Sequence, residues 1–309
     1  MQTPNDQHLP TAALNYKLIK KIRDERFDED LIHQYDLLIH IGSRDLQVGV
    51  IDTAENRLLL LEDYVFPNVS SPEDLSQLLD ELFDAHPFLK AAFWKCIKIS
   101  IKNNKFVQVP DALFVDGSQA EYLKFNAQIE EDEEVLSIHH KRIKAFTVFA
   151  FPRNLRSWLL NLYPSKEPLF MHQSAALIEG ITQFSSHKRD NPLYIYVHRF
   201  KLHIMSCRQG KLLYYNQFVI KQFSDYIRYI MLVMKSLSLD QSSSQVHLWG
   251  YIGKNSPHYH EFYKYIRNVI FGFRPRHLNY GYMFDEVQDH HFYDLYCMDL
   301  LGPSDLYSK

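Results

Sequence analysis

The sequence is poor in glycine, with ten glycines among 309 residues, whereas a usual share is about 7%. Because glycine lets a backbone approach phosphate groups closely, this scarcity argues against an ordinary nucleotide enzyme. An excess of one charge is also missing, since 34 basic and 37 acidic residues give a net charge of -3. A nucleic-acid-binding domain carries a strongly basic face, so we expect no nucleic-acid partner.

Cysteine is scarce as well. Cys96, Cys207 and Cys297 lie far apart and form no Cys-x-x-Cys pair, so we expect reduced thiols that behave as small core residues. No apolar stretch reaches the ~18 residues that suggest a membrane helix. The first 21 residues contain no apolar core of a secretory signal. We therefore expect a cytoplasmic protein without a membrane span.

The chain does have enough apolar residues for large buried cores, because 46% of it is hydrophobic. We expect a polar, charged lead-in over residues 1–34 and a first lobe over residues 35–188. That lobe opens with a nearly all-apolar run at 37–41, which is typical of a strand buried on both faces. Two further strands follow after short turns. A helix then begins after Ser71, a good N-cap that precedes a proline.

The same order of elements returns in the second half of the chain. Alternating apolar residues predict strands at 193–197, 201–207 and 211–219, and an apolar stripe predicts the helix that follows them. A polar, turn-rich segment at 185–192 separates the two halves. We therefore expect an internal duplication, with a second lobe over residues 189–309 and a mixed sheet in each lobe.

The duplicated unit resembles the ribonuclease-H-like half of actin-like ATPases, especially the pilus-assembly and cell-division branch. In that superfamily a turn with an Asp-x-Gly pattern joins the first two strands of each lobe. The resemblance implies that its backbone N–H groups hold phosphates and its aspartate helps to place magnesium. Residues 39–43 match the first turn through Gly42 and Ser43, but His40 stands in place of the aspartate. In the second turn, Tyr196 replaces the aspartate and His198 replaces the glycine.

A third element of the superfamily is a glycine-rich turn that holds adenosine. Residues 246–253 lie at the corresponding place and keep Gly250 and Gly253, with the bulky Tyr251 and Ile252 between them. Over residues 35–300, the pattern is similar to a family of uncharacterised Bacteroidetes proteins with an actin-like fold. That family is catalogued only as a domain of unknown function, so the resemblance implies a fold and no established activity.

The replaced residues predict a degenerate ATPase. Magnesium prefers oxygen ligands, and neither an imidazole at His40 nor a neutral phenol at Tyr196 replaces a carboxylate. The side chain of His198 also fills space that a glycine would leave for phosphate. The alternative is that this register is wrong by one or two residues and that a nearby aspartate, Asp36 or Asp45, is the acidic residue. Under the main interpretation we assign no catalytic residue, no metal and no cofactor.

Other candidate sites are weaker. Histidines are paired at 139–140, 258/260 and 290–291, but they lack the three or four ligands that a zinc site needs. A metal-dependent hydrolase built on them is a remote alternative. The aromatic segment at 292–296 predicts a helix that docks on the second lobe.

The leading hypothesis is a non-catalytic actin-like protein that acts through an unknown protein partner, as a scaffold or regulator. The main alternative is an ATP-binding actin-like ATPase with an atypical phosphate site. The sequence leaves the oligomeric state, the partner and any ligand of the cleft between the lobes open.

Overall fold

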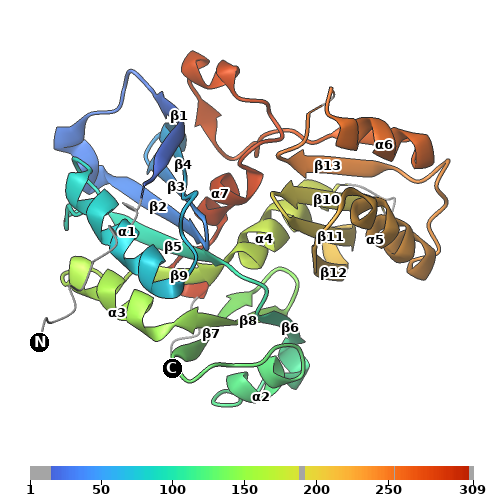
Figure 1. Ribbon diagram of the computed structural model, residues 1–309, viewed down its shortest axis with the longest axis horizontal. Coiled ribbons are helices and arrows are strands. Elements are labelled where there is room, and N and C mark those ends of the chain that lie inside the picture. The colour runs from blue at the N-terminus through green and yellow to red at the C-terminus, as the bar shows by residue number, and fades with distance from the viewer. Residues whose placement is uncertain (1–14, 188–191, 254, 306–309) are drawn as a thin grey trace, which may run out of the picture.

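The computed structural model describes residues 15–187, 192–253 and 255–305. Figure 1 shows two lobes, each built on its own sheet, with a small third sheet below the first lobe. The first sheet has the strand order β1-β4-β3-β2-β5-β9, and β15 pairs with β4. Its strands are β1 (Lys17–Arg23), β2 (Tyr35–Gly42), β3 (Asp45–Asp52), β4 (Arg57–Val65), β5 (Cys96–Lys102), β9 (Leu169–His172) and β15 (Asn279–Tyr280).

The central strand β2 is buried along its whole length, as its apolar run predicts. It pairs antiparallel with β3 and parallel with β5. One face of the sheet packs against two helices, α1 (Pro72–Ala85) and α3 (Arg153–Leu162). The other face packs against α4 (Gln173–Ser185) and α7 (Tyr293–Cys297). Ser71 caps α1 as expected, in a reciprocal capping box with Asp74.

A small subdomain extends from the first lobe. Its antiparallel sheet has the order β6-β8-β7 and its own apolar core, on which α2 packs. The elements are β6 (Phe106–Pro110), α2 (Gln119–Lys124), β7 (Glu133–His140) and β8 (Ala145–Pro152).

The second lobe has a five-stranded sheet with the order β12-β11-β10-β13-β14. One face packs against α5 and α6, and the other faces α4 and α7. The elements are β10 (Leu193–His198), β11 (Lys201–Arg208), β12 (Lys211–Val219), α5 (Phe223–Ser236), β13 (Val246–Gly250), α6 (Pro257–Tyr265) and β14 (Val269–Phe271). As in the first lobe, two antiparallel pairings precede a helix and a parallel pairing. The two lobes thus share one connectivity, as the repeated pattern predicts.

Two segments lie elsewhere than the sequence pattern predicts. Part of the expected lead-in forms β1, an edge strand of the first sheet, and a 3₁₀ helix over Glu29–Gln34. The aromatic segment forms α7 as a short helix, but it packs between the lobes and not on the second lobe alone: α7 lies against α4, and the ring of Tyr293 lies 4.9 Å from that of Trp249. Residues 1–14 and the expected boundary at 188/189 lie outside the described residues.

The C-terminal part of the chain returns to the first lobe, where β15 pairs with β4. After β15 come 3₁₀ helices at Tyr282–Glu286, Met298–Leu300 and Pro303–Asp305, and a further one, Asp111–Leu113, lies in the small subdomain. All three cysteines are free, with Cys207 and Cys297 buried and Cys96 half-buried. In the described part of the chain, no helix is both long and apolar enough to cross a membrane.

Candidate functional site

The residues that the sequence analysis singled out converge where the two lobes meet. His40 lies in β2 and Tyr196 lies in β10, a central strand of the second sheet. Both side chains are buried and both bond to one carboxylate, that of Asp294 on α7. Two positions that sequence comparison treats as separate turns thus share one partner.

Asp294 is fully buried and has four hydrogen-bond donors. His40 Nε2 lies 3.0 Å and Gln173 Nε2 lies 2.7 Å from its Oδ2. The Tyr196 hydroxyl donates to Oδ1, which also lies 2.9 Å from the backbone nitrogen of Leu295. A carboxylate offers about four acceptor positions, so protein donors occupy all of those of Asp294.

The ionisation of this group follows from its surroundings. Burial alone would raise the pKa of Asp294, but the charge of His40, the hydrogen bond from His40 and the charge of Lys102 outweigh it and hold the pKa well below its usual value. Burial and the charge of Lys102 lower the pKa of His40, whereas Asp294 opposes this effect. Burial and Asp294 raise the pKa of Tyr196 well above its usual value. The arrangement is one buried carboxylate held by four protein donors.

A second buried carboxylate, Asp45, lies at the start of β3. Lys102 Nζ, from the end of β5, lies 2.5 Å from its Oδ2 and 3.1 Å from Gln47 Oε1. Burial would raise the pKa of Asp45, but Lys102 and the other nearby cations lower it strongly. His198 Nε2 and Arg199 Nε approach Asp45 at 3.5 and 3.8 Å. This second group joins one anion to Lys102 of the first lobe and Arg199 of the second, with His198 beside them.

Further hydrogen bonds cross between the lobes near Asp45. Gln47 Nε2 lies 2.7 Å from the Tyr251 hydroxyl, which in turn donates to Asp63 at 3.0 Å. Lys201 Nζ donates to the backbone carbonyl of Lys102 at 2.7 Å. These partly buried contacts tie β3, β4 and β5 to β11 and to the loop after β13.

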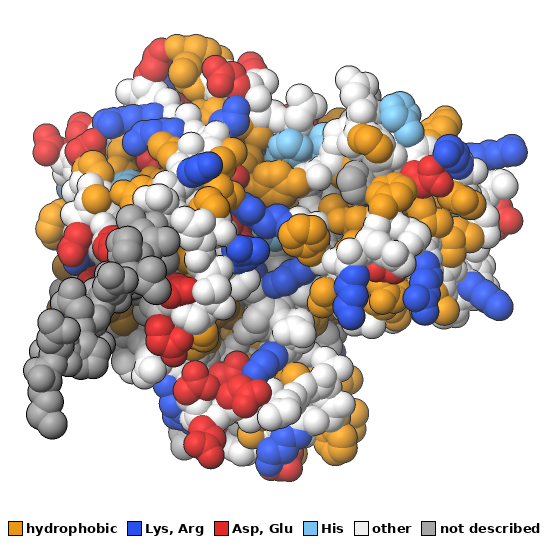
Figure 2. All heavy atoms as spheres, in the orientation of Figure 1, with side chains coloured by type: hydrophobic (Ala, Val, Ile, Leu, Met, Phe, Trp, Pro, Cys, Tyr) orange, Lys and Arg blue, Asp and Glu red, His pale blue; other side chains and the backbone are white. Residues whose placement is uncertain are grey.

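Beside Asp45 the lobes line a cavity of ≈ 450 Å³ that is open to solvent, which we call the cationic cavity. The turn residues Gly42 and Ser43 form part of its wall, together with His198. Basic side chains gather in the centre of the molecule where the lobes meet (Figure 2). Four basic residues line the cavity: Arg44, Lys102, Arg199 and Lys201.

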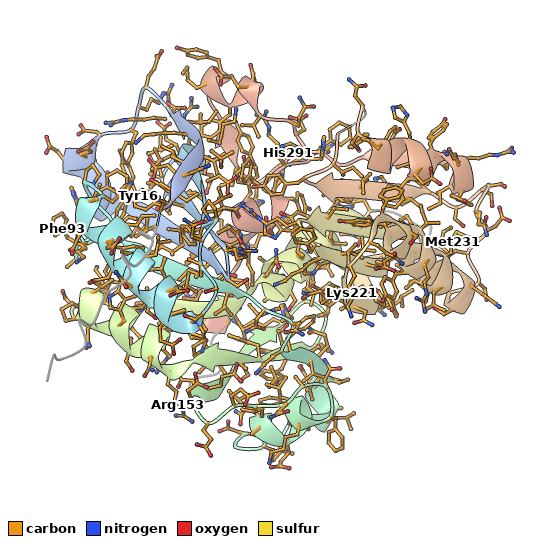
Figure 3. The ribbon with its side chains drawn as sticks, viewed as in Figure 1. Tyr16, Phe93, Arg153, Lys221, Met231 and His291 are labelled. Carbon is orange, nitrogen blue, oxygen red and sulfur yellow. The ribbon has the colours of Figure 1, made fainter. Side chains whose placement is uncertain are left out.

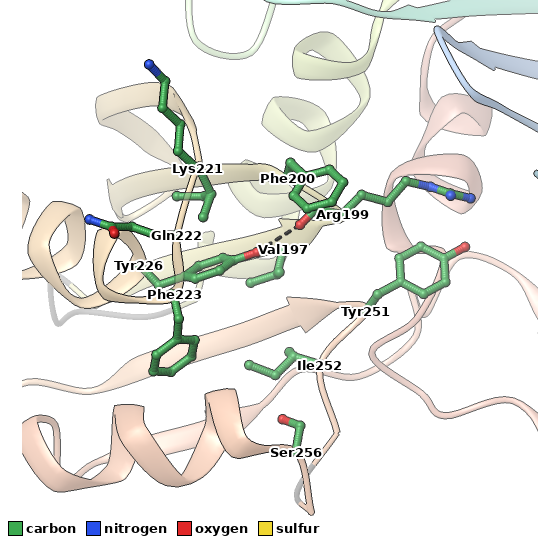
Figure 4. A pocket seen from close by; sticks show the side chains of 11 residues that line it. Val197, Arg199, Phe200, Lys221, Gln222, Phe223, Tyr226, Tyr251, Ile252 and Ser256 are labelled. Carbon is green, nitrogen blue, oxygen red and sulfur yellow. Dashed lines mark hydrogen bonds between the residues drawn. The ribbon is translucent and has the colours of Figure 1, made fainter. Parts of the chain in front are cut away.

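A second cavity of ≈ 490 Å³ lies within the second lobe and is mainly apolar (Figure 4). Tyr251 and Ile252, the bulky residues between the two glycines of the third element, form part of its wall. Gly250 is needed for chain geometry, since its φ is +94° and an added Cβ would lie 1.9 Å from the Val197 carbonyl oxygen. Gly253 has no atom within 4 Å of such a Cβ, so no packing requires glycine there.

The remaining candidates are structural. Asp36, one acidic residue of the alternative register, lies at the opposite end of β2 and pairs with Lys98. His140 bonds to Glu179 and Thr147, and His290 bonds to the carbonyl of Ile252. Figure 3 places His291 on the loop before α7. Within the described residues, no three histidine, cysteine or acidic side chains are grouped as a metal site requires.

Comparison with known families identifies the chain. The model of the family described as "Protein of unknown function (DUF3822)" matches residues 24–269. The chain belongs to this family. No curated protein matches the sequence of this DUF3822 member.

Solved structures define the fold. One is a Bacteroides thetaiotaomicron protein described as having an actin-like ATPase fold and unknown function. It is 22% identical with a TM-score of 0.76, over 89% of this chain and 99% of that one. Another is the PilM–PilN type IV pilus biogenesis complex, in which one chain is 12% identical with a TM-score of 0.56, over 86% of this chain and 97% of that one. The DUF3822 member therefore has the actin-like ATPase fold, and the fold class expected from the duplicated pattern is confirmed.

Sequence reasoning found some of these residues and missed others. The structure brings His40 and Tyr196 together, and it places Gly42, Ser43 and His198 on the cationic cavity. Asp294 was missed, although it is the single acidic residue in the aromatic segment at 292–296. A charge within such an otherwise apolar segment is a signal for a buried, paired group.

Proposed function

We propose that this protein is a non-catalytic member of the actin-like fold, a pseudo-ATPase that acts through contacts with another protein as a scaffold or regulator. One observation carries the proposal. The carboxylate nearest to His40 and Tyr196 is that of Asp294, and protein donors occupy all of its acceptor positions.

Phosphoryl transfer depends on positioning and on a metal ion that neutralises developing charge. Magnesium needs oxygen ligands in a near-octahedral shell. Asp294 is saturated by hydrogen bonds, and Asp45 is bound by Lys102 at 2.5 Å. Using either carboxylate for magnesium would require breaking buried, charge-assisted hydrogen bonds, each of which is worth roughly 1.5–3 kcal/mol.

The same bonds oppose a nucleotide-driven movement of the lobes. Opening would separate Tyr196 from Asp294 and Gln47 from Tyr251, and it would leave several buried polar groups without partners. A fixed relation between the lobes suits a protein that presents surfaces to a partner. The similarity in fold to a chain of the PilM–PilN complex supports a protein as the partner.

Calorimetry with ATP, in magnesium and in EDTA, tests the proposal beside a steady-state phosphate-release assay. We expect no magnesium-dependent binding and no release above the rate without protein. Magnesium-dependent micromolar binding, or turnover that His198→Ala or Asp45→Asn abolishes, would contradict the proposal.

The alternative, an ATP-binding protein with an atypical phosphate site, is favoured by one observation. The cationic cavity and the apolar cavity share Arg199 and Phe200, so an anionic group and an apolar group of one ligand could occupy neighbouring spaces. ATP that binds equally well in EDTA, is not hydrolysed and competes with adenosine would support this alternative.

A further inference from the structure

The cationic cavity has more positive charge than the protein itself neutralises. Four basic residues and one acidic residue, Asp45, line it, which leaves three positive charges in excess (four minus one) when all are ionised. Lys102 already lies 2.5 Å from the single carboxylate. Within the described residues, Arg44 and Lys201 form no ion pair, and Arg199 has only Asp45, at 3.8 Å.

The contacts of these three side chains confirm the imbalance. Arg44 and Lys201 donate to backbone carbonyls, those of Pro67 and Lys102. Arg199 Nε is 3.8 Å from Asp45 and, among the described residues, has no hydrogen-bond partner. His198 Nε2 is buried beside Arg199 and also has no hydrogen-bond partner among these residues. Donors of this kind are costly to bury without an acceptor.

The backbone holds Arg199 in a special position. Its φ is 53°, in the left-handed region that few side chains other than asparagine and aspartate adopt readily. The Tyr226 hydroxyl donates to its carbonyl oxygen at 2.8 Å (Figure 4), which stabilises this turn between β10 and β11. Such local strain is tolerated where it serves a function.

The geometry points to the cationic cavity as a binding site for a small phosphate-bearing anion, held without a metal ion. Arginine and lysine side chains there would supply the charge that magnesium supplies in an ATPase, with a guanidinium suited to two phosphate oxygens. Its volume lies within the ~300–1,000 Å³ of small-molecule sites. Phe66, Phe200 and Val219 give it an apolar wall for the remainder of the molecule.

The protonation of Lys201 provides a second way to measure anion binding. Burial lowers its pKa, Asp45 opposes this and Lys102 adds to it, which gives a pKa of about 8. Two further titratable groups near Lys201, His172 and His203, also have pKa values that burial lowers. A bound anion would raise the pKa of Lys201, so binding at pH 8 should take up protons.

This inference does not rest on the proposed function, because a metal-free anion site is compatible with either answer on ATP hydrolysis. The test is calorimetry of the full chain in EDTA with inorganic phosphate, pyrophosphate and phenyl phosphate. We expect binding of pyrophosphate, with heats at pH 8 that differ between buffers of different ionisation enthalpy. Tighter binding of phenyl phosphate than of inorganic phosphate would identify an ester with an apolar body, and the reverse order would identify a free phosphate.

Variants locate the site. Arg199→Gln removes a half-exposed side chain and should weaken pyrophosphate binding about 10-fold to 100-fold, as the loss of one charge-assisted hydrogen bond predicts. Arg44→Gln, at the exposed rim, should weaken it in the same direction without affecting folding. Lys124→Met is the matched control, because this exposed lysine on α2 pairs only with Glu121 among the described residues. We expect binding as in the unaltered protein.

Three results would overturn the inference. They are no binding of any of the three probes, equal binding by the Arg199 variant and the Lys124 control, and binding that appears only with magnesium. The last would also contradict the proposed absence of a magnesium site, whereas the first two leave that proposal intact.

Discussion

Asp294 and Asp45 are both buried carboxylates between the two lobes, but their partners differ. Four hydrogen-bond donors surround Asp294 closely: an imidazole, an amide, a phenol and a backbone N–H group. Two cations, Lys102 and Arg199, and the His198 imidazole lie beside Asp45, and among the described residues only Lys102 is hydrogen-bonded to it. The first group is filled with protein atoms, whereas the second borders a cavity of ≈ 450 Å³.

The difference separates two roles of charge at one interface. A carboxylate whose acceptor positions are all occupied fixes the relative position of the elements that supply its donors. A carboxylate outnumbered by cations leaves positive potential that a diffusible anion can neutralise. The fold thus fixes the relative position of the two lobes at Asp294 and leaves an excess of positive charge beside Asp45.

Replacing Asp294 should have the largest effect on stability. Asp294→Asn keeps the shape but turns an NH₂ group toward donors such as His40 and Gln173. It also removes the charge on which their hydrogen bonds depend. We expect a loss of about 5 kcal/mol in the free energy of unfolding, measured by urea denaturation. Asp289→Asn, at a half-exposed ion pair with Arg274, is the control and should cost less than about 1 kcal/mol.

The same variant should change the acid sensitivity. The folded-state pKa of Asp294 lies below the ordinary value of 3.8, so its stabilisation is fully present above that value and is lost as the pH falls below it. Asp294→Asn should therefore flatten this part of the stability curve below pH ~4. An unchanged slope would mean that Asp294 is not ionised in the folded protein.

Asp45→Asn should be destabilising to a smaller extent, by about 3 kcal/mol, because it leaves Lys102 without its carboxylate. The variants of the two carboxylates should respond differently to an added anion. Added pyrophosphate should restore part of the lost stability of Asp45→Asn, since it supplies a substitute anion, and none of that of Asp294→Asn. Equal rescue of both variants, or of neither, would remove the distinction between the two carboxylates.

Tyr196→Phe tests a single bond across the lobes and should cost about 2 kcal/mol, because the lost hydrogen bond goes to a charged acceptor. Tyr163→Phe is its matched control: this tyrosine is also buried, but it donates to a neutral carbonyl, that of Leu89. The control should cost about 1 kcal/mol. Thermal and urea denaturation of both variants measure the difference, and equal losses would argue against a charged Asp294.

The sequence was informative wherever local patterns decide the structure. Alternating apolar residues and the buried run at 37–41 located the repeated strands, and Ser71 located the start of α1. The sequence pattern did not predict the edge strand β1, because lysine and arginine occupy four of its seven positions and only Ile22 is buried. Its place depends on pairing with β4, which no local pattern reveals.

The site itself was only half predictable. His40 and Tyr196 were recognised as unusual residues at their positions, but the partner that explains them lies 254 residues from His40 along the chain. The cationic cavity combines the ends of β2 and β5 with the turn after β10. Such groupings depend on how the two sheets pack, and the charge of Lys102 or Arg199 taken alone looks like an ordinary surface charge.

The most direct test of the account is a crystal of the full chain soaked with manganese, a magnesium substitute with strong anomalous scattering, together with ATP. We predict no anomalous peak within coordination distance of Asp294 or Asp45, and the Asp294 hydrogen bonds to His40, Gln173 and Tyr196 unchanged. A manganese ion bound to either carboxylate, with the lobes rearranged around it, would contradict the central claim that the protein itself fills the metal position.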